Sequence, residues 1–260
     1  MEKIKQKVIN LLSSDDVIPL FEDQLTERLE LTPEEESKLH EVLNQMVREG
    51  RLVQTKKKKY ALPEDLGYLT GRLQGNAKGF GFFIPDKGEE DVFISAENLN
   101  GAMHNDRILI RLLKSNGRSK EGEVVRILDR ANKTVVGTFE KDKNFGYVVP
   151  DDRRIYQDIF VPKDEIKDVK NGYKVVAEIV RWPQKRRNPE GRIIEVLGHK
   201  DDVGTDILSI IRQFNLPEEF PEQVLQSAGK IPQTIPEEEI KKRKDLRNLR
   251  VITIDGADAK

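Results

Sequence analysis

Hydrophobic residues recur every three or four positions along the first fifty residues, and this spacing predicts three helices. The three apolar stripes are Ile4, Val8, Leu11 and Leu12; then Leu20, Leu25 and Leu29; then Leu39, Val42, Leu43, Met46 and Val47. Thr32 is placed to cap the third helix, with Pro33 at its first position and Glu35 completing a capping box. Gly50 is a stop signal for the same helix.

Two short strands follow, Leu52-Val53 and Tyr60-Ala61-Leu62, joined by a lysine-rich turn. Three helices and a hairpin predict a winged helix over residues 1–63. A recognition helix approaches DNA with its N-terminal residues. Here that end carries Glu34, Glu35 and Glu36, which phosphates would repel. Auxiliary RNA contact or domain docking is therefore favoured over sequence-specific DNA reading, although the lysines of the turn could hold a nucleic-acid backbone.

The alternating pattern of strands dominates residues 66–200, and it occurs twice. Phe80 matches Phe145 at a separation of 65 positions, and Asp91 matches Asp158 at 67. Each copy holds about five short strands. The expected fold is therefore α+β and multidomain, with two small closed barrels of the oligonucleotide-binding kind over residues 66–130 and 131–200.

Each copy contains a glycine-spaced aromatic pair followed by a third aromatic residue. The segments are Lys78-Gly79-Phe80-Gly81-Phe82-Phe83 with Asp91-Val92-Phe93-Ile94, and Lys143-Asn144-Phe145-Gly146-Tyr147-Val148 with Asp158-Ile159-Phe160-Val161. Alternation places the two aromatics of each pair on one face of the strand. Three aromatics and a lysine predict a surface on which unpaired bases stack, which points to single-stranded RNA as the partner.

The alternative is that these rings fill the barrels. Val92 and Ile94 flank Phe93, so if both aliphatic residues face inward, Phe93 faces outward. Gly79 and Gly81 are expected to leave an open face beside Phe80. The predicted stacking residues are Phe80, Phe82 and Phe93 in the first copy and Phe145, Tyr147 and Phe160 in the second, whereas Phe83 is assigned to the core.

Basic residues near these motifs are candidate phosphate contacts. They are Lys78, Lys143 and the loop Lys185, Arg186 and Arg187. The single tryptophan, Trp182, precedes this loop and is interpreted as a packing residue at a strand end.

Charge is distributed unevenly although the chain has a net charge of −1. Residues 1–50 carry 6 basic and 12 acidic side chains, a net of −6. Residues 51–200 carry 30 and 22, a net of +8, and residues 201–260 carry 9 and 12, a net of −3. The basic surplus coincides with the two aromatic motifs, where a phosphate backbone needs it.

The absence of cysteine excludes disulfides, thiol nucleophiles and zinc fingers. The three histidines are far apart and form no metal-ligand pattern. The sequence contains neither an apolar run of transmembrane length nor the apolar core of a signal peptide, so a soluble, cytoplasmic protein without membrane contact is expected.

The last part of the chain, residues 201–260, changes character again. Two short helices are expected at Asp206 to Phe214 and Glu222 to Ala228, and a strand is expected over Leu249 to Gly256. That strand would end in the carboxylate of Asp255.

The aromatic repeats resemble cold-shock domains, and the order of parts narrows the resemblance. A winged helix, two cold-shock-like barrels, a helical connector and the segment Thr253-Ile254-Asp255-Gly256 resemble the N-terminal portion of the bacterial ribonuclease R family, which belongs with RNase II in the RNB family. Those enzymes are processive 3′-to-5′ hydrolytic exoribonucleases. The resemblance implies a front end that feeds single-stranded RNA to a nuclease domain, with structured RNA or ribosome-associated factors as further partners of the winged helix.

The resemblance also implies that Asp255 is one ligand of a Mg²⁺ cluster in the complete enzyme. Metal-assisted hydrolysis needs several carboxylates, so this chain is expected to be inactive alone, as a truncated nuclease. Asp258 matches a position not usually counted among the ligands. Without the resemblance, Asp255 reads as an ordinary strand-end acid. The remaining alternatives are a stand-alone cold-shock RNA-binding protein or RNA chaperone, and a winged-helix regulator whose barrels bind a protein.

Overall fold

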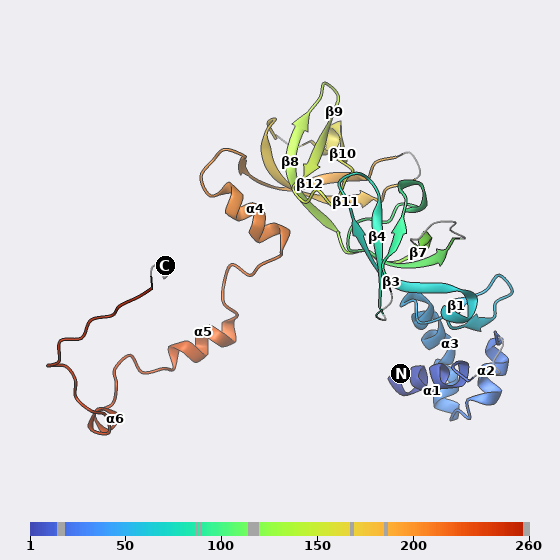
Figure 1. The fold of residues 1–260 in the computed structure, drawn as a ribbon, viewed down its shortest axis with the longest axis horizontal. Coiled ribbons are helices and arrows are strands. Elements are labelled where there is room, and N and C mark those ends of the chain that lie inside the picture. The colour runs from blue at the N-terminus through green and yellow to red at the C-terminus, as the bar shows by residue number, and fades with distance from the viewer. Residues whose placement is uncertain are drawn as a thin grey trace. The chain divides into compact units, whose positions relative to one another are not determined.

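The computed structural model describes residues 1–14, 19–86, 88, 90–113, 120–166, 169–184 and 187–256. The chain divides into two units, Met1–Asn215 and Leu216–Lys260. The first unit contains three N-terminal helices, a two-stranded sheet, two closed five-stranded barrels and one further helix (Figure 1). Within the described residues, no helix is both long enough and apolar enough to cross a membrane.

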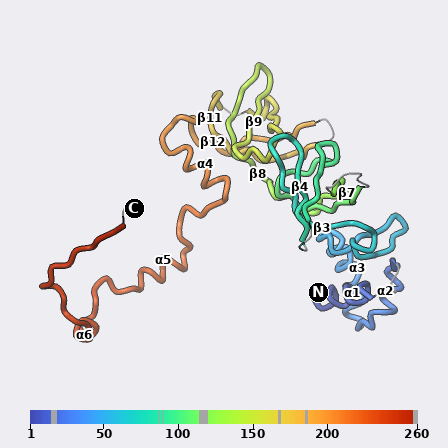
Figure 2. Tube along the Cα trace, viewed as in Figure 1, coloured from blue at the N-terminus to red at the C-terminus, as the bar shows by residue number. Residues whose placement is uncertain are grey.

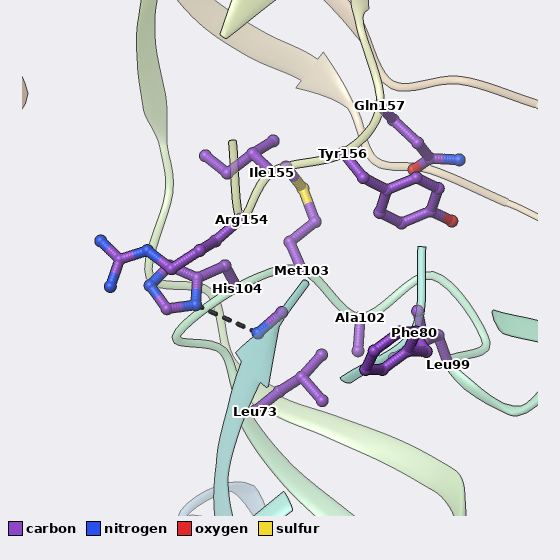
Figure 3. Close-up of a pocket in the computed structure, with 11 residues that line it drawn as sticks. Leu73, Phe80, Leu99, Ala102, Met103, His104, Arg154, Ile155, Tyr156 and Gln157 are labelled. Carbon is purple, nitrogen blue, oxygen red and sulfur yellow. Dashed lines mark hydrogen bonds between the residues drawn. The ribbon is translucent and has the colours of Figure 1, made fainter. Parts of the chain in front are cut away.

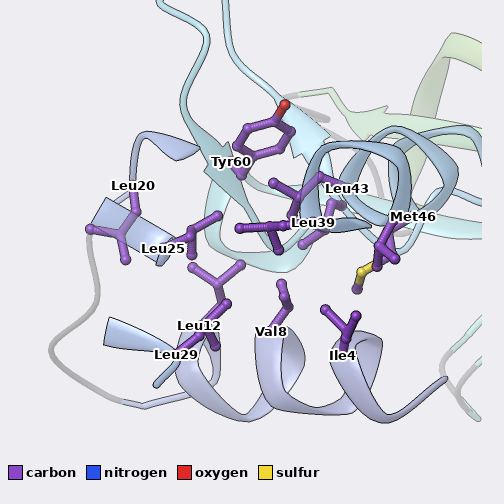
Figure 4. Close-up of a cluster of buried hydrophobic side chains, with 12 residues drawn as sticks. Ile4, Val8, Leu12, Leu20, Leu25, Leu29, Leu39, Leu43, Met46 and Tyr60 are labelled. Carbon is purple, nitrogen blue, oxygen red and sulfur yellow. The ribbon is translucent and has the colours of Figure 1, made fainter. Parts of the chain in front are cut away.

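The N-terminal helices are α1 (Glu2–Leu12), α2 (Glu22–Arg28) and α3 (Pro33–Arg48), followed by β1 (Val53–Gln54) and β2 (Tyr60–Ala61). The predicted capping box of α3 is confirmed: the Glu35 amide donates to Thr32 Oγ1 at 3.3 Å, and the Thr32 amide donates to Glu35 Oε2 at 3.2 Å. Figure 4 shows α1 side chains such as Ile4 and Val8 packing beneath Leu39, Leu43 and Met46 of α3.

Leu20 departs from the prediction, because it lies outside α2. It pairs instead with Tyr60 through two backbone hydrogen bonds, of 3.0 and 2.7 Å, and so extends the edge of the β1–β2 sheet. Both side chains are buried in the helical core. The apolar spacing therefore located a core residue correctly but assigned it to the wrong element.

The first barrel contains β3 (Tyr68–Gly75), β4 (Gly81–Pro85), β5 (Val92–Ile94), β6 (Arg107–Leu112) and β7 (Glu121–Asp129), in the order β3-β4-β5-β7-β6. The second contains β8 (Thr134–Lys141), β9 (Phe145–Pro150), β10 (Ile159–Pro162), β11 (Tyr173–Arg181) and β12 (Glu190–His199), in the equivalent order β8-β9-β10-β12-β11. One parallel pairing closes each barrel, between β5 and β7 and between β10 and β12. The duplication seen in the sequence is thus a duplication of the whole strand order.

Short 3₁₀ turns precede or connect the barrel strands: η1 (Glu64–Leu66), η2 (Ala96–Asn98) and η3 (Lys163–Glu165). Each barrel has its own apolar core, centred on Phe83 in the first and Phe139 in the second, both fully buried. The assignment of Phe83 to the core is confirmed. Trp182 is half-buried against the second core, which confirms it as a packing residue.

The glycine between the paired aromatics faces the barrel interior. A Cβ added at Gly81 would lie 2.8 Å from Leu73 Cδ1, and one at Gly146 would lie 2.3 Å from Cε2 of Phe139. The expectation that Gly81 clears a face beside Phe80 was therefore wrong, because this position points away from that face. It is glycine because the packed core leaves no room for a side chain.

The helix α4 (Thr205–Gln213) packs on the second barrel, where Arg212 Nε donates to Glu195 Oε2 at 2.8 Å. The second unit contains α5 (Glu222–Gly229) and α6 (Glu237–Lys241), which Figure 2 traces along the chain. Both predicted helices of this region are confirmed, and α6 was not foreseen.

The predicted strand at 249–256 was wrong. Residues 251–256 have no regular secondary structure, and Val251, Ile252 and Ile254 are exposed. β-branched residues favour a strand only where a neighbouring strand bonds their backbone. No described residue supplies that neighbour here.

Candidate nucleic-acid interface

Three predicted stacking residues come together on the outer surface of the first barrel. Phe82 on β4 lies directly opposite Phe93 on β5. The ring centroids are 5.9 Å apart for this pair, 5.7 Å for Phe80 and Phe82, and 5.5 Å for Phe80 and Phe93. The flanking Val92 and Ile94 are buried in the core, so Phe93 faces outward as expected. We call Phe80, Phe82 and Phe93 the first triad.

The second barrel repeats this arrangement. Tyr147 on β9 lies opposite Phe160 on β10, with ring centroids 6.1 Å apart. Phe145 lies 5.2 Å from Tyr147 and 5.7 Å from Phe160. We call Phe145, Tyr147 and Phe160 the second triad. In both triads the rings are mutually inclined, so they support one another edge to face and leave part of their surfaces to solvent.

The triad rings are only partly exposed, the exposed fraction reaching 37% for Phe82. Mutual packing covers their edges and fixes their orientation. A ring held in this way loses little conformational freedom when a base stacks on it, which favours binding. The surface therefore has the chemistry of a preformed stacking platform.

The candidate phosphate contacts are less defined than the rings. Lys78 is exposed in the turn before β4, where its amide donates to Asn76 Oδ1 at 3.0 Å. Lys143 is exposed before β9. Arg187 is also exposed, and its amide donates to the Gln184 carbonyl at 2.9 Å. Lys185 and Arg186 lie outside the described residues. The role of all five in phosphate binding stays a prediction.

Asp255 is exposed, and the described residues contain no group of three or more histidine or acidic side chains placed to hold a metal ion. Asp258 lies outside the described residues. The predicted metal-binding role of Asp255 therefore stays a prediction.

An ion pair between a buried aspartate and a partly buried arginine, at the junction of the two barrels, was not foreseen. Asp106, in the turn before β6, is fully buried. Arg130, between β7 and β8, donates through Nη1 to Asp106 Oδ2 and to the Gly101 carbonyl, both at 2.8 Å. The guanidinium of Arg130 also lies 4.3 Å from the Trp182 ring of the second barrel. One arginine thus connects a carboxylate of the first barrel with an aromatic ring of the second.

Two backbone amides complete the partners of Asp106. The Met103 amide donates to Oδ2 at 2.8 Å and the Ala131 amide to Oδ1 at 3.0 Å. Burial raises the pKa of Asp106, while these amides and Arg130 oppose that rise. Nothing in the sequence spacing marks Asp106 or Arg130, because each is a single charged residue in a charged chain.

A small cavity also lies between the barrels (Figure 3). The first barrel contributes Leu73, Phe80, Leu99, Ala102, Met103 and His104, and the β9–β10 loop contributes Arg154, Ile155, Tyr156 and Gln157. Its volume of about 10 Å³ is enough for one water molecule. His104 accepts a hydrogen bond through Nδ1 from the Gly75 amide at 3.2 Å, and its buried Nε2 has no partner among the described residues.

Burial lowers the pKa of His104, and the positive charge of Arg154 adds to the shift. The folded state thus prefers the neutral ring. The contribution of His104 to the free energy of unfolding is therefore fully present above the ordinary histidine pKa of about 6.5. It is lost as the pH falls below that value, because the unfolded chain takes up a proton more readily than the folded chain. We expect His104→Asn to remove this part of the pH dependence, a slope of at most about 1.4 kcal/mol per pH unit for one proton.

Urea unfolding of wild type and His104→Asn between pH 7.5 and 5.5 measures this effect. The wild-type free energy of unfolding should fall more steeply with decreasing pH than that of the variant. Parallel pH profiles would show that His104 does not control stability in this range.

Comparison with known proteins supports the likeness inferred from the motifs. A family model of the ribonuclease B OB domain matches residues 71–127, and a cold shock domain model matches residues 147–221. The first match covers most of the first barrel, and the second begins in β9 and extends beyond α4.

The relatives are ribonucleases R. The Thermotoga maritima protein is 36% identical over 265 residues, an alignment that covers all of this chain and 37% of the relative. The Escherichia coli K12 protein is 34% identical, with 93% of this chain and 30% of the relative covered. The chain thus spans about a third of the length of these two relatives.

Two solved structures agree in fold. The apo form of Mycoplasma genitalium RNase R has a TM-score of 0.56 and 26% identity, with 66% of this chain and 28% of that chain covered. The same enzyme in complex with ribose-methylated single-stranded RNA has a TM-score of 0.60 and 26% identity, covering 74% and 31%. With an RNB OB domain and a cold shock domain in sequence, the chain belongs to the RNB family and corresponds to the N-terminal region of ribonuclease R.

Proposed function

We propose that this chain binds single-stranded RNA through the first and second triads, as the RNA-binding part of a 3′-to-5′ hydrolytic exoribonuclease of the cytoplasm. The observation that supports this most is the pair of matched triads on the outer surfaces of two barrels with the same strand order. Aromatic faces that converge on a surface accept any unpaired base, because every base has a π-face. A processive nuclease needs such tolerance of sequence.

The charge distribution and the relatives also support binding of single-stranded RNA. Residues 51–200, which contain both triads, carry 30 basic and 22 acidic side chains, and this net charge of +8 favours contact with phosphates. The M. genitalium relative has been solved with single-stranded RNA. Lys78, Lys143 and Arg187 are the basic residues that we assign to the phosphate backbone of the same ligand.

The described residues do not form a site for the Mg²⁺ ion that the proposed hydrolysis requires. Hydrolysis of a phosphodiester by Mg²⁺ requires several carboxylates around the ion. Asp255 is a single exposed carboxylate, and no acidic cluster surrounds it in the described part of the chain. We therefore assign this chain no hydrolytic step, and Asp255 contributes one ligand only within a complete nuclease domain.

The N-terminal part has a proposed supporting role. The order of α1, α2 and α3 followed by the β1–β2 hairpin supports a winged helix. Glu34, Glu35 and Glu36 form the first turn of α3, which disfavours insertion into a DNA groove. The exposed lysines 56–58 of the hairpin favour contact with structured RNA or with ribosome-associated factors.

Binding of a labelled 12-nucleotide single strand and of a blunt duplex of the same length tests the proposal. We expect the single strand to bind at least tenfold more tightly, because only unpaired bases reach the triads. Its affinity should also fall as salt increases, by a log–log slope of roughly −0.7 for each phosphate neutralised. Equal affinity for both ligands, or binding that ignores salt, would refute the proposal.

A further inference from the structure

A second hollow opens at the junction of the barrels, next to the first triad. It has a volume of about 350 Å³ and includes Glu97, Asn100, Tyr156, Gln157 and Gln184 in its lining. This volume lies within the range of roughly 300–1,000 Å³ that is typical of small-molecule sites. We call it the junction groove.

The junction groove is continuous with the first triad through Tyr156. This residue, on the β9–β10 loop of the second barrel, lines both the groove and the small cavity that Phe80 borders (Figure 3). Its ring also packs on Gly79, where an added Cβ would lie 3.4 Å from Cδ2 and Cε2. Phe80 and Tyr156 therefore border the same cavity.

Tyr156 has the properties of a stacking residue rather than of a core residue. Its exposed fraction is 42%, larger than that of Phe82, whereas its neighbour Ile155, the other apolar residue of the loop, is buried. Within the described part of the chain, its hydroxyl has no hydrogen-bond partner. An aromatic ring held against one barrel by another, with a hydroxyl that has no partner among the described residues, offers a base both a π-face and a polar contact.

The polar side chains of the groove are suited to the edge of a base. The side-chain amides of Gln157 and Gln184 have no partner among the described residues, and each offers a donor and an acceptor. Glu97 is exposed and offers acceptors only. A carboxylate favours a base edge with several N–H donors and repels one dominated by carbonyl oxygens.

We propose that the junction groove binds one unpaired nucleobase, stacked on Tyr156, and that Glu97 makes the site prefer guanine to uracil. Guanine presents two adjacent N–H groups on its Watson–Crick edge, which a carboxylate accepts together, whereas uracil presents two carbonyl oxygens and one N–H. The triads tolerate every base, so the groove gives this chain a base preference of its own. This inference rests on the proposed binding of single-stranded RNA.

Fluorescence anisotropy of the full chain with a 12-mer of uridine and with a mixed uridine–guanosine 12-mer tests the site. The mixed oligonucleotide should bind more tightly to wild type. Tyr156→Ala should weaken binding of the mixed oligonucleotide about tenfold, a value expected for the loss of one stacked base. Tyr156→Phe keeps the aromatic ring and should therefore retain most of the wild-type affinity. Glu97→Gln should reduce the ratio of the two affinities.

The same titrations separate an error about the junction groove from an error about RNA binding itself. If wild type binds neither oligonucleotide, both are wrong. If wild type binds but Tyr156→Ala has no effect, or if Glu97→Gln leaves the ratio unchanged, the groove does not hold a base as proposed and the triads alone account for binding. Loss of binding in Tyr156→Phe equal to that in Tyr156→Ala would also contradict stacking.

Discussion

Phe80→Ala combined with Phe145→Ala is expected to weaken binding of a single-stranded 12-mer by at least about 30-fold. Each base stacked on an aromatic ring contributes roughly 1–3 kcal/mol, so the loss of one ring from each triad removes at least about 2 kcal/mol. The effect should be larger than the sum over two isolated rings. Phe80 and Phe145 each contact both other rings of their triad, at 5.2–5.7 Å between centroids, and hold them in place.

Phe220→Ala is the matched control for this experiment. Phe220 is 72% exposed and lies in the second unit, outside both barrels. Its loss should leave RNA affinity within about twofold of wild type, as expected for a surface substitution away from the binding site. Anisotropy titrations with one labelled oligonucleotide compare all variants. An unchanged affinity in the double variant would eliminate the stacking interpretation.

Asp106→Ala is expected to destabilise the protein by roughly 3–5 kcal/mol, the cost typical of removing one partner of a buried ion pair. Asp106 is fully buried, and its loss leaves the Met103 and Ala131 amides without an acceptor and Arg130 without its counter-charge. Because Arg130 also lies over Trp182, the junction between the barrels should loosen as well. Urea unfolding followed by circular dichroism measures the loss.

The chain also contains an exposed ion pair between an aspartate and an arginine, which serves as the control. Asp86 pairs with Arg107 at 2.7 Å, close to the 2.8 Å of the buried pair, but both side chains are exposed. Exposed pairs contribute about 0–1 kcal/mol, so Asp86→Ala should be nearly neutral. If Asp106→Ala were as mild as Asp86→Ala, the junction would not depend on the buried carboxylate.

The triads could be predicted from the sequence because strand alternation is a local rule. Two positions separated by one residue share a face, and this placed Phe80 with Phe82 and Phe145 with Tyr147. The third aromatic in each copy follows from pairing between neighbouring strands, and the duplication made chance agreement improbable. The distances between ring centroids show that each predicted set is one cluster.

The junction could not be predicted because its residues are related only in three dimensions. Asp106, Arg130 and Trp182 are separated by 24 and 52 positions and belong to turns, where no periodicity applies. Tyr156 carries a weak signal as an aromatic residue in a largely polar loop. Gly81 illustrates a similar limit of prediction. Strand alternation indicates that this position faces inward, but it does not reveal the close approach of Leu73 that excludes a side chain.

The strand expected at 249–256 failed for a related reason. Val251, Ile252 and Ile254 have strong intrinsic preference for strands, but a strand is stabilised by its neighbours. The described residues provide none, and these side chains are exposed. Local composition therefore identified a segment able to form a strand without indicating its partner.

Photocrosslinking of the chain to a 12-mer that contains 5-iodouridine, followed by mass spectrometry of the adducts, shows directly whether RNA lies on the two triads. We expect adducts on rings of both triads, at Phe80, Phe82 or Phe93 and at Phe145, Tyr147 or Phe160. Adducts confined to the N-terminal helices, or to residues 201–256, would contradict this expectation.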